Sequence, residues 1–278
     1  MRRILVTLAI IAFFFVMVTP VFAGFDTLPD HYITRSYNYV LDGRQGTISL
    51  ALSTEIYQDY VGKDPLWDTS DTQAYFLNFV NDPAQKPAIR TLAEEIRGLD
   101  DNPDNQARIA ANLVQHIPYD TGEKYRYPYE VLYEGRGVCG EKSMLLASLL
   151  GELGFKSAVL YFQPLNHMTA GIACDAPYNF KGSDYCMIET TGVSIITDES
   201  SMRNETTVTV LGENEWSRPN VTVISEGRSL ESAQFDYYDS RLWIHMKSEN
   251  TKVREGDPRL SQKEYEQFYR LKNKYDLS

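Results

Sequence analysis

The sequence is poor in residues that bind metal ions, with three cysteines and four histidines among 278 residues. No two histidines have the His-x-x-x-His spacing of a helical zinc site, so an all-protein zinc centre is not expected. The acids Asp100, Asp101 and Asp104 lack the regular alternation of a calcium loop and are interpreted as favourable charges at a helix start. No phosphate loop or dinucleotide fingerprint occurs either. The sequence therefore predicts no metal and no cofactor.

Basic residues are also scarce. Lys and Arg number 27 against 38 Asp and Glu, which gives a formal net charge of −11, and no basic tract is present. A chain of this charge is a poor partner for phosphate backbones, so nucleic acid is excluded as an expected partner. Apolar residues make up 43% and charged residues 23%, without a repeat or a low-complexity tract. These values exclude disordered, collagen-like and coiled-coil proteins.

One long hydrophobic run is present, and it stands at the N-terminus. Arg2 and Arg3 precede an uncharged stretch over 4–18, and a small residue, Ala23, follows. This pattern predicts a signal peptide over 1–23. An uncleaved anchor is the alternative, because 4–25 is just long enough to span a bilayer. Either way the rest of the chain is expected outside the cytosol, with membrane contact only through this segment. Loss of the two arginines gives a charge of 25 − 38 = −13.

The remaining sequence predicts helices followed by strands, which favours an α+β fold. A strand pair is expected at 31–40 and 46–52, where Ile48, Leu50 and Leu52 alternate. Proline and glycine punctuation and apolar periodicity predict helices at 54–60, 87–98, 102–117, 139–153 and 261–275. Apolar runs predict strands at 157–162, 167–174, 185–191, 206–211 and 220–224.

A glycine-rich turn over 135–140 delivers Cys139 to the first turn of an apolar helix. Unpaired N–H groups and the helix dipole at this end favour the thiolate, which is the nucleophilic form of cysteine. A backbone N–H there also provides one half of an oxyanion hole. The alternative is a buried structural cysteine on a helix.

A thiol nucleophile needs a base and a group that orients the base. His167 opens one predicted strand, and Glu189 lies on the next, which is otherwise apolar. A carboxylate on an apolar strand is costly unless it is paired. The gap of 22 positions suits neighbouring antiparallel strands, on which the two side chains face each other across the pair.

This ordered set of motifs resembles the transglutaminase-like superfamily, a circularly permuted relative of papain-type thiol enzymes. The matching stretches are 127–132, 137–140, 149–155, 167–168 and 189–191. The resemblance covers about 104–192, and a looser likeness to secreted archaeal and bacterial members extends back to the strand pair. It implies a catalytic cysteine at a helix N-terminus, packed on an antiparallel sheet.

By position, the resemblance makes Cys139 the nucleophile, His167 the general base and acid, and Glu189 the orienting residue of a catalytic triad. The family more often has Asp where Glu189 stands, and the extra methylene shifts the carboxylate. Acids often flank the family's cysteine, whereas Val138, Gly140 and Lys142 do so here. We interpret this as altered surroundings rather than loss of the nucleophile.

The resemblance also divides the chain. A catalytic core is expected over 101–200, with strands and helices of 24–100 packed on it. A C-terminal extension over 201–278 ends in a helix and contains no interpretable motif; it packs on the core or presents a substrate.

The second oxyanion donor is less evident. Gln115, Tyr129 and Tyr133 lie upstream of the nucleophile and carry hydrogen-bond donors. Packing, or a structural hydrogen bond, is the alternative for each of them.

Cys174 and Cys186 remain, and two cysteines left over in a secreted chain are expected to form a disulfide. The triad raises a conflict with this pairing. If His167 directly opposes Glu189, then Cys174 opposes Gly182, and a bulge or an irregular excursion over 175–184 is needed to bring the sulfurs together.

The sequence thus predicts an exported thiol enzyme that acts on an amide or peptide bond through an acyl-enzyme. Its expected partners are a protein, a peptide or a cell-envelope amide. A hydrolase, either a cysteine protease or an amidase, is favoured over an acyltransferase that cross-links proteins. The alternative is a catalytically silent binding module of the same fold at the cell surface.

Overall fold

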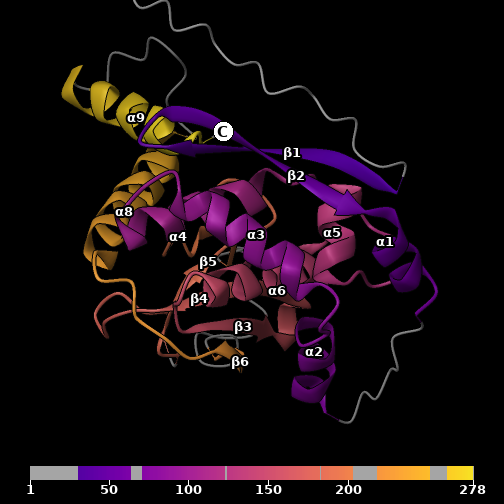
Figure 1. Cartoon of the computed structure of the whole chain (residues 1–278). Coiled ribbons are helices and arrows are strands. Elements are labelled where there is room, and N and C mark those ends of the chain that lie inside the picture. The colour runs from indigo at the N-terminus through magenta and orange to yellow at the C-terminus, as the bar shows by residue number, and fades with distance from the viewer. Residues whose placement is uncertain are drawn as a thin grey trace, which may run out of the picture.

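In the computed structural model, a four-stranded antiparallel sheet is covered on one face by helices (Figure 1), which confirms the α+β class and the antiparallel sheet. The structure describes residues 31–63, 71–122, 124–181, 183–202, 218–250 and 262–277. The order of the strands in the sheet is β5-β4-β3-β6, with β3 at Ser157–Phe162, β4 at His167–Ala173, β5 at Tyr185–Ile188 and β6 at Asn220–Ser225.

A separate hairpin at the start of the described chain forms a second sheet. Strand β1 (Tyr32–Leu41) pairs with β2 (Arg44–Ser53) around the turn at Asp42-Gly43. Both turn residues have positive φ angles of 50° and 75°, which the Asp-Gly pair accommodates with little strain. The alternating side chains of β2, Ile48, Leu50 and Leu52, are buried as the sequence predicts.

The helices cover the sheet and the hairpin. They are α1 (Thr54–Val61), α2 (Thr72–Val80), α3 (Lys86–Arg97), α4 (Pro103–His116), α5 (Pro128–Glu134), α6 (Cys139–Glu152), α8 (Ala233–Asn250) and α9 (Gln262–Tyr275). Two 3₁₀ turns, η1 (Gln163–Leu165) and η2 (Ser200–Met202), complete the elements. No helix among the described residues is long and apolar enough to cross a membrane.

Most of the elements predicted from the sequence are confirmed, to within a few residues at their ends. Helices α2, α5 and α8 were not predicted from the sequence. The strand expected at 206–211 and the segment 1–23 lie outside the described residues.

Helix α6 is the centre of the molecule. It lies between strands β3 and β4 on one side and helices α3, α4 and α5 on the other (Figure 1). Its side chains from Met144 to Ala147 are fully buried, as expected of a helix that contacts protein on every side. One hydrophobic cluster runs from Tyr37 of β1 to Ala233 of α8. The strands and helices before residue 100 therefore share a core with the segment that follows them.

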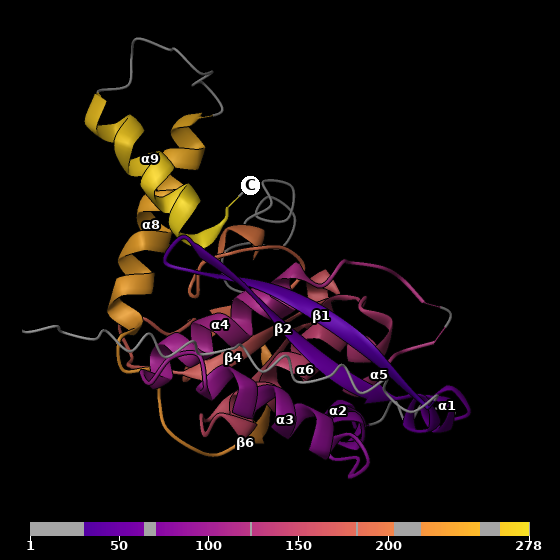
Figure 2. The ribbon, with the colours of Figure 1, turned by 45° about the horizontal axis from the view of Figure 1, so that its top comes forward.

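The C-terminal helices pack on this body. Figure 2 shows α8 and α9 side by side at one edge of the molecule. Asp236 of α8 is buried and accepts a hydrogen bond from Arg108 of α4 at 2.6 Å, while the backbone N–H of Gly43 donates to Lys274 of α9 at 3.1 Å. Trp243 of α8 stacks on Phe268 of α9. Of the two expectations for the extension, packing on the core is thus observed.

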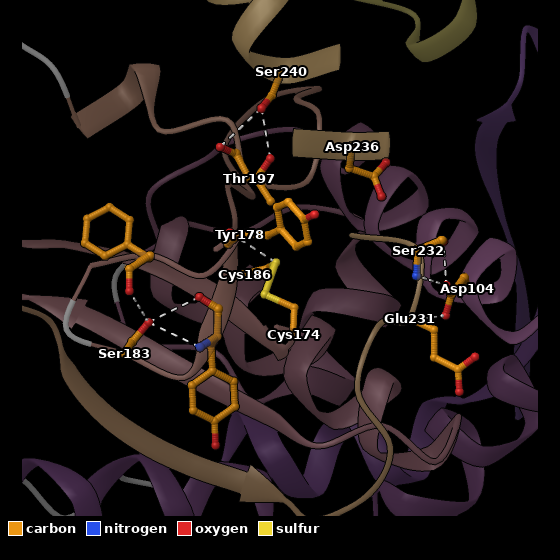
Figure 3. The surroundings of a disulfide bond; sticks show 12 residues. Asp104, Cys174, Tyr178, Ser183, Cys186, Thr197, Glu231, Ser232, Asp236 and Ser240 are labelled. Carbon is orange, nitrogen blue, oxygen red and sulfur yellow. Dashed lines mark hydrogen bonds between the residues drawn. A yellow bond between two sulfur atoms is a disulfide. The ribbon is translucent and has the colours of Figure 1, made fainter. Parts of the chain in front are cut away.

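The predicted disulfide between Cys174 and Cys186 is present, with a Cα–Cα distance of 5.7 Å (Figure 3). Direct opposition of His167 and Glu189 would have paired Cys186 with Ala170, but Cys186 pairs with Ile172 instead. This shift of two residues moves Cys186 toward Cys174, so the condition of a direct His167–Glu189 opposition does not hold. In this register Cys174 stands opposite Asp184, so the sulfurs meet beyond the last strand pair, Ala173 with Tyr185, where the chain turns at 176–178.

A polar turn joins the two bridged strands. The hydroxyl of Ser183 donates to the carbonyl of Phe180 at 2.9 Å, and the N–H of Tyr185 donates to that hydroxyl at 3.3 Å (Figure 3). These bonds satisfy backbone groups where the chain reverses. The disulfide closes a loop across a sequence separation of 12 residues and belongs to an oxidising environment.

The disulfide yields a stability prediction. Replacing both bridged cysteines, as Cys174→Ala with Cys186→Ala, should lower the free energy of unfolding by about 3 kcal/mol, since a loop of this length restricts the unfolded chain by that amount. Urea denaturation of the variant and of the wild type measures the difference. A reduced wild type should match the variant, and equal stability of oxidised wild type and variant would contradict the prediction.

Candidate active site

The site is built around the first turn of α6. Gly135 ends α5 with a φ of 68°, a left-handed conformation that glycine adopts without strain. The backbone of Gly137 then pairs with the preceding loop: its N–H donates to Pro118 at 3.1 Å, and its carbonyl accepts from Asp120 at 3.3 Å. The turn is thereby fixed, and it delivers Cys139 to the helix start as the sequence predicts.

The buried side chain of Glu141 caps the N-terminus of α6. Its carboxylate accepts the N–H of Val138 at 2.9 Å and the N–H of Arg126 at 2.8 Å. The side chain of Arg126 is 4% exposed and forms ion pairs with Glu141 at 3.1 Å and with Glu134 at 2.9 Å. The loop before α5 and the end of α5 are thus tied to the first turn of α6, two residues after Cys139. Neither Glu141 nor Arg126 was predicted from the sequence to belong to the site.

The three residues predicted as the triad come together. His167 opens β4, and its Nε2 lies 2.9 Å from Oε2 of Glu189, the residue that follows β5. This contact leaves Nδ1 of the imidazole for the hydrogen bond between His167 and Cys139. Cys139 is a free thiol and is partly exposed.

The electrostatics of the three groups reinforce one another. Burial alone would raise the pKa of Cys139, but the hydrogen bond from His167 and the N–H of Met168 lower it below the ordinary value. Burial alone would lower the pKa of His167, but Cys139 and Glu189 raise it to about 10. The site thus favours a thiolate beside an imidazolium.

Glu189 is held as a carboxylate. Burial would raise its pKa, but His167 and the N–H of Thr191 lower it to about 2. Oε1 accepts the N–H groups of Thr190 and Thr191, each at 2.9 Å, and the Thr191 hydroxyl at 2.8 Å. The glutamate side chain, one methylene longer than aspartate, therefore folds back so that Oε1 contacts the backbone of the next two residues. Oε2 remains for the hydrogen bond with His167.

The three predicted oxyanion donors are engaged elsewhere. The amide nitrogen of Gln115 donates to the carbonyls of Glu189 at 2.8 Å and Ser194 at 3.0 Å. The Tyr129 hydroxyl donates to the carbonyl of Ser53 at 2.9 Å. The Tyr133 hydroxyl lies 3.1 Å from that of Thr54, and its ring stacks on Tyr57. For all three residues these contacts are the structural hydrogen bonds and packing named as the alternative, and Gln115 holds the main chain of Glu189.

Lys142 is a buried ammonium beside the site. It is fully buried on α6, and its Nζ donates to the carbonyls of Gln115 at 3.2 Å and Ile117 at 2.5 Å, at the end of α4. Burial lowers the pKa of Lys142 to about 8, although the negative charge of Glu189 acts to raise it. Lys142, which departs from the acidic flanks expected from the resemblance, thus ties the end of α4 to α6.

Two hydroxyls link the nucleophile to the strand of the acid. Ser143 and Thr190 lie 3.0 Å apart, and the Thr190 hydroxyl donates to the carbonyl of Cys139 at 3.3 Å.

Within the described ranges, no group of three or more His, Cys, Asp and Glu side chains is arranged to hold a metal ion.

Comparison with known proteins gives one family. Residues 90–182 match the family model of the transglutaminase-like superfamily. The match includes Cys139 and His167 and ends before Glu189, so the assignment of the acid rests on its 2.9 Å contact with the imidazole. No curated protein and no solved structure matches the chain.

The lowered pKa of Cys139 gives a prediction for alkylation. Because the thiolate reacts with iodoacetamide, the rate should reach half of its plateau at a pH below the ordinary cysteine pKa of 9.0. His167→Ala removes both the hydrogen bond and the positive charge of His167, which lower this pKa. The midpoint of the alkylation rate should therefore move to higher pH. Rates measured from pH 5 to 10 check both statements.

A surface histidine provides the control. His31 is exposed and pairs with Glu55 at 3.6 Å, so His31→Ala should leave the midpoint unchanged. A wild-type midpoint at or above that of free cysteine would contradict the assignment of the thiolate–imidazolium pair.

Proposed function

We propose that the protein, which carries a transglutaminase-like domain at residues 90–182, is an exported thiol enzyme that cleaves or transfers an amide or peptide acyl group. The observation that carries the proposal is the chain of contacts from Cys139 through His167 to Glu189. A binding module of the same fold has no need of a thiol, an imidazole and a carboxylate in one hydrogen-bonded line.

The reaction follows from these contacts. The Cys139 thiolate attacks the amide carbonyl, and the carbonyl electron pair moves to the oxygen to give a tetrahedral intermediate. The imidazolium of His167 then gives its proton to the leaving amine as the C–N bond breaks, which leaves an acyl-enzyme. Glu189 keeps the ring oriented and favours its charged form.

The fate of the acyl-enzyme decides the class of reaction. The neutral imidazole takes a proton from water or from a second amine, which attacks the thioester carbonyl and releases the thiol. Water gives hydrolysis, while an amine gives acyl transfer. We favour a peptidase or amidase, because water reaches a partly exposed thiol without a second binding site for an acceptor.

The proposed place of action is the cell surface or the medium. A disulfide-bonded chain belongs to an oxidising compartment, and the apolar N-terminal run fits a signal peptide or an anchor. Proteins, peptides and cell-envelope amides are the substrates that an enzyme in that place meets.

Substitution of the triad tests the activity. Wild type and Cys139→Ala are screened against libraries of peptides and cell-wall amides, with release of free amine as the readout. Cys139→Ala should abolish turnover while the far-UV circular dichroism stays the same. His167→Ala should lower kcat by about 10³-fold, within the range of general acid–base catalysis. Glu189→Gln should have a milder effect, since the imidazole remains.

The acyl-enzyme supplies a second readout. Mass spectrometry of wild type mixed with an active substrate should show the mass of the acyl group on the intact protein and, after digestion, on the peptide that contains Cys139. Turnover that persists in Cys139→Ala would contradict the proposal. Specific binding of a cell-surface ligand without turnover would favour the silent binding module.

A further inference from the structure

The site described above lacks one component of acyl transfer. The backbone N–H of Cys139 lies at a helix start and offers one hydrogen bond to the oxygen of a tetrahedral intermediate. Gln115, Tyr129 and Tyr133 are engaged elsewhere and do not offer a second. A second donor would have to lie over the first turn of α6.

Tyr125 lies in that position. It belongs to the loop before α5, and its hydroxyl lies directly over Gly140, the residue after the nucleophile. A Cβ added at Gly140 would be 1.6 Å from the Tyr125 oxygen and 2.6 Å from Sδ of Met168. Only glycine therefore leaves room at this position for the phenol, which explains why a residue without a side chain follows Cys139.

The hydroxyl of Tyr125 has a weak partner. Among the described residues, its hydrogen bond goes to Sδ of Met168 at 3.6 Å, and a thioether is a poor acceptor. A buried phenol usually donates to an oxygen. The hydroxyl can therefore exchange this bond for a stronger one to a substrate oxygen at little cost.

The ring is held in place before any substrate arrives. It packs edge-on against Phe79, with ring centroids 5.4 Å apart, and lies 6.3 Å from the ring of Tyr75. Burial raises the pKa of Tyr125 well above its ordinary value, and the charge of Cys139 raises it further. The group thus stays a neutral phenol with a proton to donate when the thiolate forms.

We propose that the Tyr125 hydroxyl is the second oxyanion donor of the site and acts together with the backbone N–H of Cys139. As the bond between sulfur and the acyl carbon forms, the carbonyl electron pair moves to the oxygen, and the phenol hydrogen bond turns from Met168 to that oxygen. No proton leaves Tyr125, and the bond returns to Met168 when the intermediate collapses. The inference rests on the proposed function and adds a catalytic residue to it.

Two reactions of the same thiol separate this role from a structural one. Acylation by p-nitrophenyl acetate passes through an oxyanion, whereas alkylation by iodoacetamide displaces iodide at a saturated carbon and forms none. Tyr125→Phe should slow acylation by about 10²-fold, the usual loss for one oxyanion donor. Alkylation should stay within about twofold of wild type, because the thiolate is unchanged.

Tyr119→Phe is the matched control. Tyr119 is 54% exposed, and its pKa is raised by burial and also by the charge of Cys139, so it lies near the same thiolate. Its removal should leave both rates unchanged. Equal losses of acylation and alkylation in Tyr125→Phe, or no loss of either, would overturn the proposal.

The wild type distinguishes failure of this inference from failure of the proposed function. If neither reagent modifies Cys139 faster than free cysteine, the thiol-enzyme function fails and the oxyanion role fails with it. If wild type reacts quickly and Tyr125→Phe acylates at the same rate, only the role of Tyr125 fails.

Gly140→Ala gives an independent check. The added methyl displaces the phenol oxygen, so this variant should also lose acylation while it keeps alkylation. In the Tyr125→Phe background the same change should cost much less, because the donor is already gone. Additive losses in the double variant would show that Gly140 acts through something other than Tyr125, and would count against the proposal.

Discussion

The buried ion pair between Glu141 and Arg126 fixes the geometry on which the rest of the site depends. Glu141 accepts the N–H of Val138 and so determines where α6 begins, and therefore where Cys139 stands. Arg126 joins the same carboxylate to Glu134 and to the loop that carries Tyr125. Removing one partner would leave a buried charge without compensation, which costs far more than the pair itself contributes.

The opposite side of the site is fixed by the sheet. Strands β4 and β5 place His167 and Glu189, and their register also places the two bridged cysteines. A shift of this register would misplace both pairs together. Lys142 and Gln115 connect the two sides, because the ammonium holds the carbonyl of Gln115 and the Gln115 amide holds the carbonyl of Glu189. Helix α6 and the edge of the sheet are thus connected through two buried polar side chains.

The sequence predicted those parts of the fold that local signals determine. Pro103 and the residues around it mark the start of α4, and the glycine-rich turn marks the start of α6. The missed helices have weaker signals: α5 has seven residues, and α8 mixes apolar and polar side chains with little periodicity. The domain division drawn from the resemblance stays a prediction, although residues on both sides of position 100 share one core.

In the candidate site, too, some residues were predicted from the sequence and others were not. Cys139, His167 and Glu189 were found because nucleophile, base and acid are recognisable residue types in a recognisable order. Tyr125 and Glu141 were not, since their roles depend on what lies across a loop and on the absence of a side chain at Gly140. The register of β4 and β5 could not be predicted from the triad, because His167 and Glu189 meet diagonally, two residues away from direct opposition.

The disulfide also has a consequence for the nucleophile. Three cysteines permit three different single bridges, and two of them would consume Cys139. The bridge that forms joins residues only 12 apart on adjacent strands, so closing the sheet selects it over the more distant pairings. Once it has closed, the chain holds no second thiol with which Cys139 can pair. A disulfide within the chain therefore cannot consume the thiol of Cys139.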